Sequence, residues 1–176
     1  TVTRYVKDIY ERDEFLQEQG VVLPGEIAGV NYDHDDFVGI DGSPYQYHEL
    51  LGAVWRESIY TFLEDDERAV TLSALMHVDG DRVPYLSRLV ERSDLTLDEW
   101  VKAFFDTVLP PLLHFLYRYG TAFSPHGQNT ILVVEDGAPS RLAVKDFADD
   151  VNVSDRPLPE LQALPEEVND VLRKEP

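Results

Sequence analysis

Five polar side chains frame one short stretch of this sequence, at the start and end of two apolar runs, TILVV and RLAV. The five are His126, Gln128, Asn129, Lys145 and Asp146. The two runs are separated by EDGAP, in which Asp136-Gly137 is a strong signal for a tight hairpin turn. Residues 129–147 are therefore predicted to form a β-hairpin. Because the start of one antiparallel strand lies beside the end of the next, the five side chains are expected to converge.

Such a set of side chains suits chemistry on nucleotide phosphates. Histidine and lysine can neutralise phosphate oxygens. Asp146 together with the amide oxygen of Asn129 would suit Mg²⁺, a hard cation that takes few protein ligands. Gln128 and Asn129 can hydrogen-bond a nucleotide or a polar substrate. The spacing is equally compatible with a polar turn and a lysine–aspartate pair on a surface hairpin.

Arginine in the segment WRES is a further candidate. Arg56 follows Val54-Trp55, and its guanidinium could bind phosphate or carboxylate with two parallel hydrogen bonds. The alternative is a structural ion pair with Glu57 or another nearby acid. The remaining histidines are weaker candidates for a functional site. His34 lies in an acidic loop, and His48, His77 and His114 lie in apolar segments. None of them has the spacing of a zinc site.

The elements that would position these residues follow from apolar spacing and breakers. Residues 1–19 predict an amphipathic helix ended by Gly20, and 21–30 predict short extended pieces. Residues 45–64 have a helical apolar stripe, which would place Arg56 on a helix. Residues 69–78 favour a strand over a short helix, and 83–93 predict a short helix.

A long helix is predicted to lead into the hairpin. Thr96 and Glu99 have the spacing of a capping box. The helix is expected to bend at Pro110-Pro111 and to end at Gly120. Prolines after Asp155 indicate a linker and then a helix fragment. The fold class is accordingly α+β, mainly helical, with a small antiparallel sheet that includes the 129–147 hairpin.

Composition limits the function classes. The chain has 176 residues, 43% of them hydrophobic, so it can bury a core. Its net charge is -19, which argues against nucleic acid and anionic membrane surfaces as partners. It has no cysteine, no apolar run long enough to span a membrane and no visible signal peptide, so a cytoplasmic protein is expected. The acidic, lysine-poor surface is typical of a halophilic protein.

The segment YGTAFSPHGQNTILVVEDGAPSRLAVKDF resembles the C-terminal signature of the siderophore synthetases that work independently of nonribosomal peptide synthetases, the IucA/IucC family. Its marks are a tyrosine–glycine helix end, HGQN, a hairpin and a basic residue followed by Asp-Phe. Upstream, LLGAVWRES resembles the family's arginine segment. The resemblance is clearest over residues 45–155.

The resemblance implies a hand-like fold and a ligase. Such enzymes use ATP and Mg²⁺ to adenylate a carboxylate of citrate or a related polycarboxylate. A polyamine, hydroxamate or amino-alcohol nucleophile then forms an amide or ester. By motif position, His126 and Arg56 would be catalytic. Gln128, Asn129, Lys145 and Asp146 would bind the nucleotide, with Asp146 and Asn129 at the metal.

The resemblance also implies how the chain is divided. Residues 1–155 would be a palm-like portion, and 156–176 a linker and the start of a thumb-like helical segment. The chain is expected to be a piece of a longer enzyme, inactive alone if missing segments complete the site. Many members carry Glu where this chain has Ser124, which marks a departure. Homodimers are common in the family.

Two other readings stay open from the sequence. A kinase-like phosphotransferase would also use a His-Gly loop, a hairpin and Asp-Phe, but Gln128 stands where a catalytic Asp is expected. A non-catalytic binding domain could keep the same fold.

The acidic composition predicts a salt-dependent stability. The melting temperature of the chain is expected to rise between dilute buffer and about 2 M salt, because salt screens the repulsion among its acids down to a Debye length of roughly 3 Å near 1 M. Thermal unfolding followed by circular dichroism measures this. A melting temperature that does not change with salt would contradict the halophilic interpretation.

Overall fold

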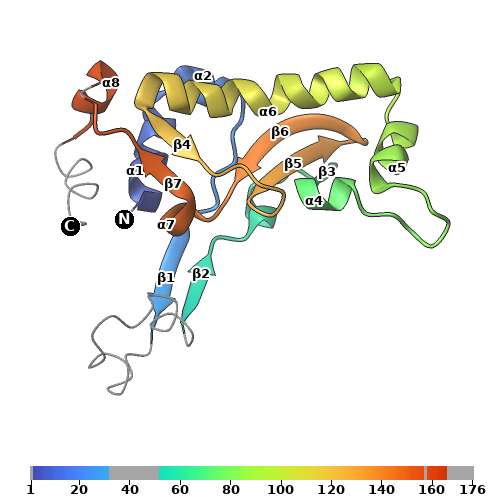
Figure 1. The fold of residues 1–176 in the computed structure, drawn as a ribbon, viewed down its shortest axis with the longest axis horizontal. Helices are drawn as coiled ribbons and strands as arrows, with labels where there is room; N and C mark the ends of the chain where they lie inside the picture. The colour runs from blue at the N-terminus through green and yellow to red at the C-terminus, as the bar shows by residue number, and fades with distance from the viewer. Residues whose placement is uncertain (1, 32–51, 157, 166–176) are drawn as a thin grey trace.

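The computed structural model describes residues 2–31, 52–156 and 158–165. Three small antiparallel sheets and a long helix form the frame (Figure 1). The central sheet has the order β3-β5-β6, from Glu67–Thr71, Thr130–Glu135 and Ala138–Val144. The other sheets pair β1 (Glu26–Val30) with β2 (Ala53–Arg56) and β4 (Thr121–Phe123) with β7 (Val151–Val153). The predicted α+β class with small antiparallel sheets is confirmed.

The central strand β5 is buried on both of its faces, as its continuous apolar sequence requires. Leu132 and Val134 face the larger core, which contains residues of the long helix. Ile131 and Val133 face a second cluster on the opposite side. Alternate residues of a strand point to opposite faces, so a run such as TILVV needs apolar neighbours on both.

The long helix α6 (Leu97–Tyr119) lies along one side of the central sheet (Figure 1). It opens with the predicted capping box, since the Glu99 amide donates to Thr96 Oγ1 at 3.4 Å and the Thr96 amide donates to Glu99 Oε2 at 2.9 Å. It continues through Pro110 and Pro111 as one helix. It ends at Gly120, which adopts the left-handed conformation with φ 58°.

The predicted hairpin is confirmed and is tied to α6. Its turn places Asp136 at φ 48° and Gly137 at φ 88°, as the turn type of an Asp-Gly hairpin requires. The Trp100 indole donates to the Gly137 carbonyl at 2.8 Å, so the long helix holds the turn. A β-carbon at Gly137 would come within 2.5 Å of the Leu89 carbonyl oxygen, which excludes other residues there.

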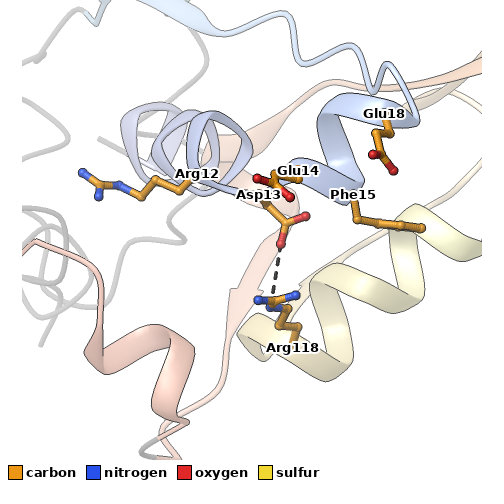
Figure 2. Close-up of a pocket in the computed structure, with 6 residues that line it drawn as sticks. All are labelled: Arg12, Asp13, Glu14, Phe15, Glu18 and Arg118. Atoms are coloured by element: carbon orange, nitrogen blue, oxygen red, sulfur yellow. Dashed lines mark ion pairs between the residues drawn. The ribbon is translucent and has the colours of Figure 1, made fainter.

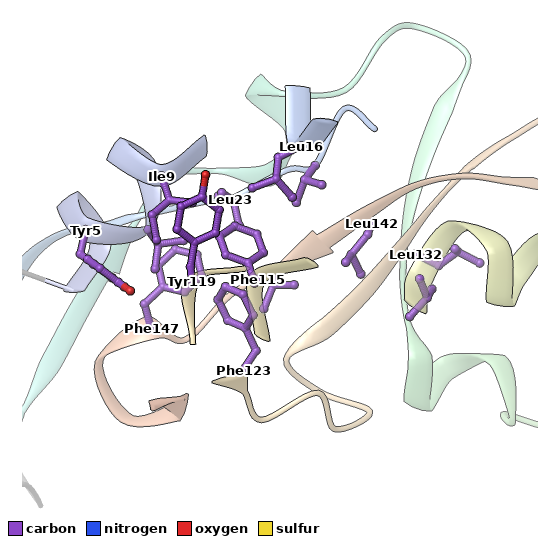
Figure 3. Packing of buried hydrophobic residues seen from close by; sticks show 14 of the residues in the cluster. Tyr5, Ile9, Leu16, Leu23, Phe115, Tyr119, Phe123, Leu132, Leu142 and Phe147 are labelled. Atoms are coloured by element: carbon purple, nitrogen blue, oxygen red, sulfur yellow. The ribbon is translucent and has the colours of Figure 1, made fainter. Parts of the chain in front are cut away.

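The N-terminal segment forms two helices, where the sequence predicted one. Asp13 ends the first helix, α1 (Val2–Arg12), and caps the second, α2 (Glu14–Glu18), by accepting from the Leu16 amide at 3.0 Å. Gly20 follows with φ 57°, as predicted for the stop. The apolar side of α1 packs beside α6 and Phe147 in the larger core, with Tyr5 and Ile9 buried (Figure 3).

The helix predicted over residues 45–64 is wrong where it can be judged. Residues 45–51 lie outside the described part, residues 53–56 form β2, and Ile59–Thr61 form a 3₁₀ turn, η2. Arg56 therefore lies on a strand. Pairing with β1, in which Glu26 opposes Arg56, outweighs the local apolar spacing. Figure 1 shows the β1–β2 ribbon extending away from the central sheet.

The remaining predicted elements are partly confirmed. Residues 69–78, predicted as a strand, divide between β3 and the short helix α4 (Leu72–Leu75). The short helix α5 (Tyr85–Arg92) forms as predicted. Past the hairpin come α7 (Phe147–Asp150) and α8 (Pro159–Gln162). Among the described helices, none has the length and apolar character that a bilayer crossing needs.

A buried carboxylate joins α2 to the end of α6. Asp13 Oδ2 accepts from the Tyr119 hydroxyl at 2.7 Å and lies 2.8 Å from His114 Nε2. Arg118 Nε lies 3.7 Å from the same oxygen, at the edge of a surface depression (Figure 2). Burial by itself would raise the pKa of Asp13, but the hydrogen bonds it accepts outweigh burial and lower the pKa below its ordinary value.

This network predicts a specific acid sensitivity. Because the pKa of Asp13 is lower in the folded state, its stabilising contribution is present above the unfolded pKa of about 3.9 and is lost as the pH falls through the folded value. Asp13→Asn should therefore be less stable than the parent at pH 6, with a difference that shrinks towards pH 2. Urea unfolding across that range measures it. The exposed Asp94→Asn serves as the control, and a constant difference for Asp13→Asn would refute the role.

Candidate functional site

The hairpin brings the two predicted groups of polar residues together. Thr130 opposes Val144 in the register, so Asn129 and Lys145 are the residues next along each strand. The Lys145 amide donates to the Asn129 carbonyl at 3.1 Å. The predicted meeting of the two strand ends is confirmed for the backbone of Asn129 and Lys145. The roles of the individual side chains stay predictions.

The loop before β5 is fixed by backbone contacts on both sides. The His126 carbonyl accepts from the amides of Asn129 and Thr130, at 3.1 and 3.0 Å. The Gly127 carbonyl accepts from the Ser73 amide of α4 at 2.9 Å. A β-carbon on Gly127 would lie 3.1 to 3.3 Å from Ser73 atoms, so only glycine fits there without movement. The loop is thus seated on α4.

Asp150, at the end of α7, connects the histidine to the amide. Its Oδ2 accepts a hydrogen bond from the side-chain nitrogen of Asn129 and lies 3.4 Å from His126 Nε2. Asn129 is buried at 4% exposure, whereas the His126 side chain is 49% exposed. His126 therefore presents its ring to solvent while one nitrogen faces a carboxylate. Gln128 is exposed beside it.

Asp150 was missed from the sequence. It belongs to the ADD cluster after KDF, which the charge pattern alone classes with the surface acids. In the structure the short helix α7 returns the chain to the loop, where the Ser124 amide donates to the Asp150 carbonyl at 2.9 Å. That return depends on the pairing of β4 with β7, which the sequence did not indicate.

Asp146 lies between two cations. Its Oδ1 is paired with Arg56 Nη2, and its Oδ2 lies 2.9 Å from Lys145 Nζ. Its backbone is left-handed, with φ 66°, an unfavourable conformation for a residue other than glycine. Strained positions of this kind are retained where the side chain's direction matters. The predicted pairing of Lys145 with Asp146 is present, and Arg56 joins it from another strand.

The guanidinium of Arg56 is only partly satisfied by its neighbours. Its Nη2 group contacts Asp146 and, at 3.5 Å, Glu26 Oε1. Its Nε atom is buried and has no hydrogen-bond partner among the residues that the structure describes. A buried donor without a partner costs roughly 1–3 kcal/mol, so the contacts among the described residues do not fully satisfy the Arg56 guanidinium. The alternative of an ion pair with Glu57 or another acid is met by Asp146 and Glu26, while Glu57 pairs with Lys7.

Two of the other histidines can be located in the structure. His77 is exposed, and His114 stacks on Phe15 with ring centroids 4.5 Å apart. His34 and His48 lie outside the described residues. Within the described ranges, no three histidine, aspartate or glutamate side chains gather as a metal site by themselves.

Comparison with known proteins places this chain in a family. A model of the IucA/IucC family matches residues 1–77, and a model described as a ferric iron reductase FhuF-like transporter matches residues 98–176. The rhizobactin siderophore biosynthesis protein RhbF of Rhizobium meliloti is 45% identical over 172 residues, 97% of this chain and 29% of that protein. Both matches therefore fall within one continuous homologous segment.

Two aerobactin enzymes agree with this placement. Aerobactin synthase of Escherichia coli is 35% identical over 169 residues, which cover 96% of this chain and 29% of the enzyme. The solved aerobactin synthetase IucC of Klebsiella pneumoniae has a TM-score of 0.79 at 34% identity, covering 96% of this chain and 30% of that one. The chain belongs to the IucA/IucC family and spans about 29% of the length of these curated relatives.

The contact of Asp150 with Asn129 predicts a loss of stability on truncation. Asp150→Ala should lower the free energy of unfolding by about 1–3 kcal/mol, because the buried amide nitrogen of Asn129 loses its acceptor. Chemical denaturation measures the change. Asp155→Ala removes an exposed acid nearby and should change stability by less than about 0.5 kcal/mol. Equal effects of the two substitutions would contradict the contact.

Proposed function

We propose that the protein containing this chain is an ATP-dependent siderophore synthetase. It activates a carboxylate of citrate or a related polycarboxylate and joins it to an amine or hydroxyl. The observation that carries the proposal is the pairing of both Arg56 and Lys145 with Asp146 at the end of the hairpin, with His126 in the loop that enters β5. This pairing lies within a segment 45% identical to a siderophore biosynthesis protein.

The substrate class is proposed from the names of relatives. They include a D-ornithine–citrate ligase of Staphylococcus aureus, 24% identical over 159 residues, and a citryl-spermidine ligase of Bacillus anthracis, 27% identical over 147. Aerobactin synthetase IucA of Klebsiella pneumoniae, solved in an ATP-bound form, shares the fold at a TM-score of 0.61 and 18% identity. Citrate and ATP are accordingly the proposed substrates, and an enzyme using cellular ATP would work in the cytoplasm.

The chemical problem at such a site is the repulsion between two anions. A carboxylate oxygen attacks the α-phosphorus of ATP and pyrophosphate leaves; a nucleophile then attacks the acyl carbon and AMP leaves. Arg56, Lys145 and His126 can supply the positive charge or hydrogen bonds that let the carboxylate approach the phosphate. Before ligands bind, Asp146 pairs with both Arg56 and Lys145, so the two cations are held in place and one positive charge is left for an anion.

The oxygen donors at the hairpin end fit Mg²⁺. The carboxylate of Asp146 and the amide oxygen of Asn129 would hold it, and both are hard ligands. The Asn129 amide nitrogen is engaged by Asp150, which leaves its oxygen for a cation. The metal would supply charge neutralisation on the phosphates. Few protein ligands are needed because nucleotide phosphates and water complete the coordination.

The division of the chain is part of the same proposal. Residues 1–155 form the palm-like portion that carries the site. Residues 156–176, within which α8 lies, begin a thumb-like segment. A homodimer is the proposed assembly.

The reaction products test the proposal. Full-length protein given ATP, Mg²⁺ and citrate with a diamine should release pyrophosphate and AMP, and release should require the polycarboxylate. His126→Ala should lower kcat/KM by about 100-fold, because a group that contacts the reacting anions is removed. His77→Ala removes an exposed histidine and should leave activity unchanged.

Two other results would overturn the proposal in different ways. Formation of ADP and a phosphorylated acid would identify a kinase-like phosphotransferase. Binding of Mg·ATP with no turnover of any polycarboxylate or amine would identify a non-catalytic binding domain.

A further inference from the structure

Glu26 lies at the base of the β1–β2 ribbon, directly opposite Arg56 in the strand register. Its side chain is only 14% exposed. The sequence gives it no motif, and it stands 30 residues from Arg56 and 120 from Asp146, so only the folded chain brings the three together. Its carboxylate contacts both Arg56 and the backbone beside Asp146.

One oxygen of Glu26 makes both contacts. Oε1 accepts from the Phe147 amide at 3.0 Å, immediately after Asp146, and lies 3.5 Å from Arg56 Nη2. The first contact holds the strained turn in which Asp146 has φ 66°. The second holds the guanidinium. Through these two contacts Glu26 holds the Arg56 guanidinium and the backbone that follows Asp146 at a fixed separation.

Helix α1 holds Glu26 in turn. Thr3 Oγ1 accepts from the Glu26 amide at 3.2 Å and donates to Glu26 Oε2 at 3.4 Å. Gly25 permits this approach, because a β-carbon there would lie 2.4 Å from Thr3 Cγ2. The carboxylate thus has one oxygen on the N-terminal helix and one at the site.

We propose that Glu26 is a positioning residue that keeps Arg56 in its working orientation, an inference that rests on the proposed role of this site in binding anions. Asp146 alone does not suffice for this task, because it is shared with Lys145 and would also be engaged by a bound cation. Glu26 has no such competing cation among its described contacts. It remains as the partner of Arg56 when a ligand takes Asp146.

The charge of Glu26 separates this role from a structural one. Glu26→Gln keeps the size of the side chain and an oxygen that can accept from Phe147, but it removes the ionic attraction to Arg56. If Glu26 only supports the backbone, glutamine replaces it without loss. If it positions Arg56, kcat/KM for the polycarboxylate falls roughly tenfold while the melting temperature stays near that of the parent.

A double-mutant cycle in the full-length protein tests the coupling. The four proteins are the parent, Glu26→Gln, Arg56→Gln and the double variant. Each is measured for kcat and KM in citrate-dependent pyrophosphate release, and for Mg·ATP affinity by calorimetry. We expect Glu26→Gln to add less than a twofold further loss when Arg56 is already replaced, because both changes disable the same group. Glu11→Gln, an exposed charge removal on α1, is the control and should match the parent.

The outcomes are distinct. A tenfold loss in both backgrounds, or no loss in the parent, would overturn the positioning role. If Glu26→Gln does not fold, Thr3→Val replaces it as a milder change, and full activity of that variant would overturn the inference. ADP formation by the parent would refute the proposed function alone. The coupling between Glu26 and Arg56 would then be calculated from the Mg·ATP affinities of the four proteins. A parent that neither binds nor turns over substrate would overturn both.

Discussion

The register of the β5–β6 hairpin is the constraint on which the candidate site depends. Residues 131–134 are buried on both faces of the sheet, so a shift of one residue would exchange the sets that face the two cores. The Asp-Gly turn and its hydrogen bond from Trp100 fix the same register from the other end. With Thr130 opposite Val144, Asn129 and Lys145 have to be neighbours. The packing of apolar side chains thus determines where the polar ones meet.

Around that end the chain adds residues from three directions. The β1–β2 ribbon supplies Arg56 and Glu26, α7 supplies Asp150, and the loop before β5 supplies His126. Arg56 and Lys145 both pair with Asp146, and the His126 ring lies beside Asp150. In a chain with 34 acidic and 15 basic residues, this local balance holds the few cations close together where an anion can be bound.

The chain matches one continuous segment of larger siderophore enzymes. The segment contains a core of its own, yet it spans only about 29% of those relatives. One face of α6 is exposed in this chain, with apolar residues spaced along its length: Leu97, Val101, Phe105, Leu109, Leu113 and Leu116. The proposed chemistry concerns the residues that this segment contributes, chiefly Arg56, Lys145 and His126, which would bring a carboxylate and a phosphate together.

The sequence by itself determined the parts of the structure that depend on local signals. The capping box at Thr96, the stop at Gly120 and the Asp-Gly hairpin each involve residues a few positions apart, so spacing alone predicted them. The neighbourhood of Asn129 and Lys145 followed from the hairpin. Only the tertiary structure decided that Arg56 lies on a strand, that Asp13 divides the first helix, and that Glu26 and Asp150 join the site. These depend on contacts between residues 21 to 121 positions apart. The energies of such contacts are not revealed by any local spacing.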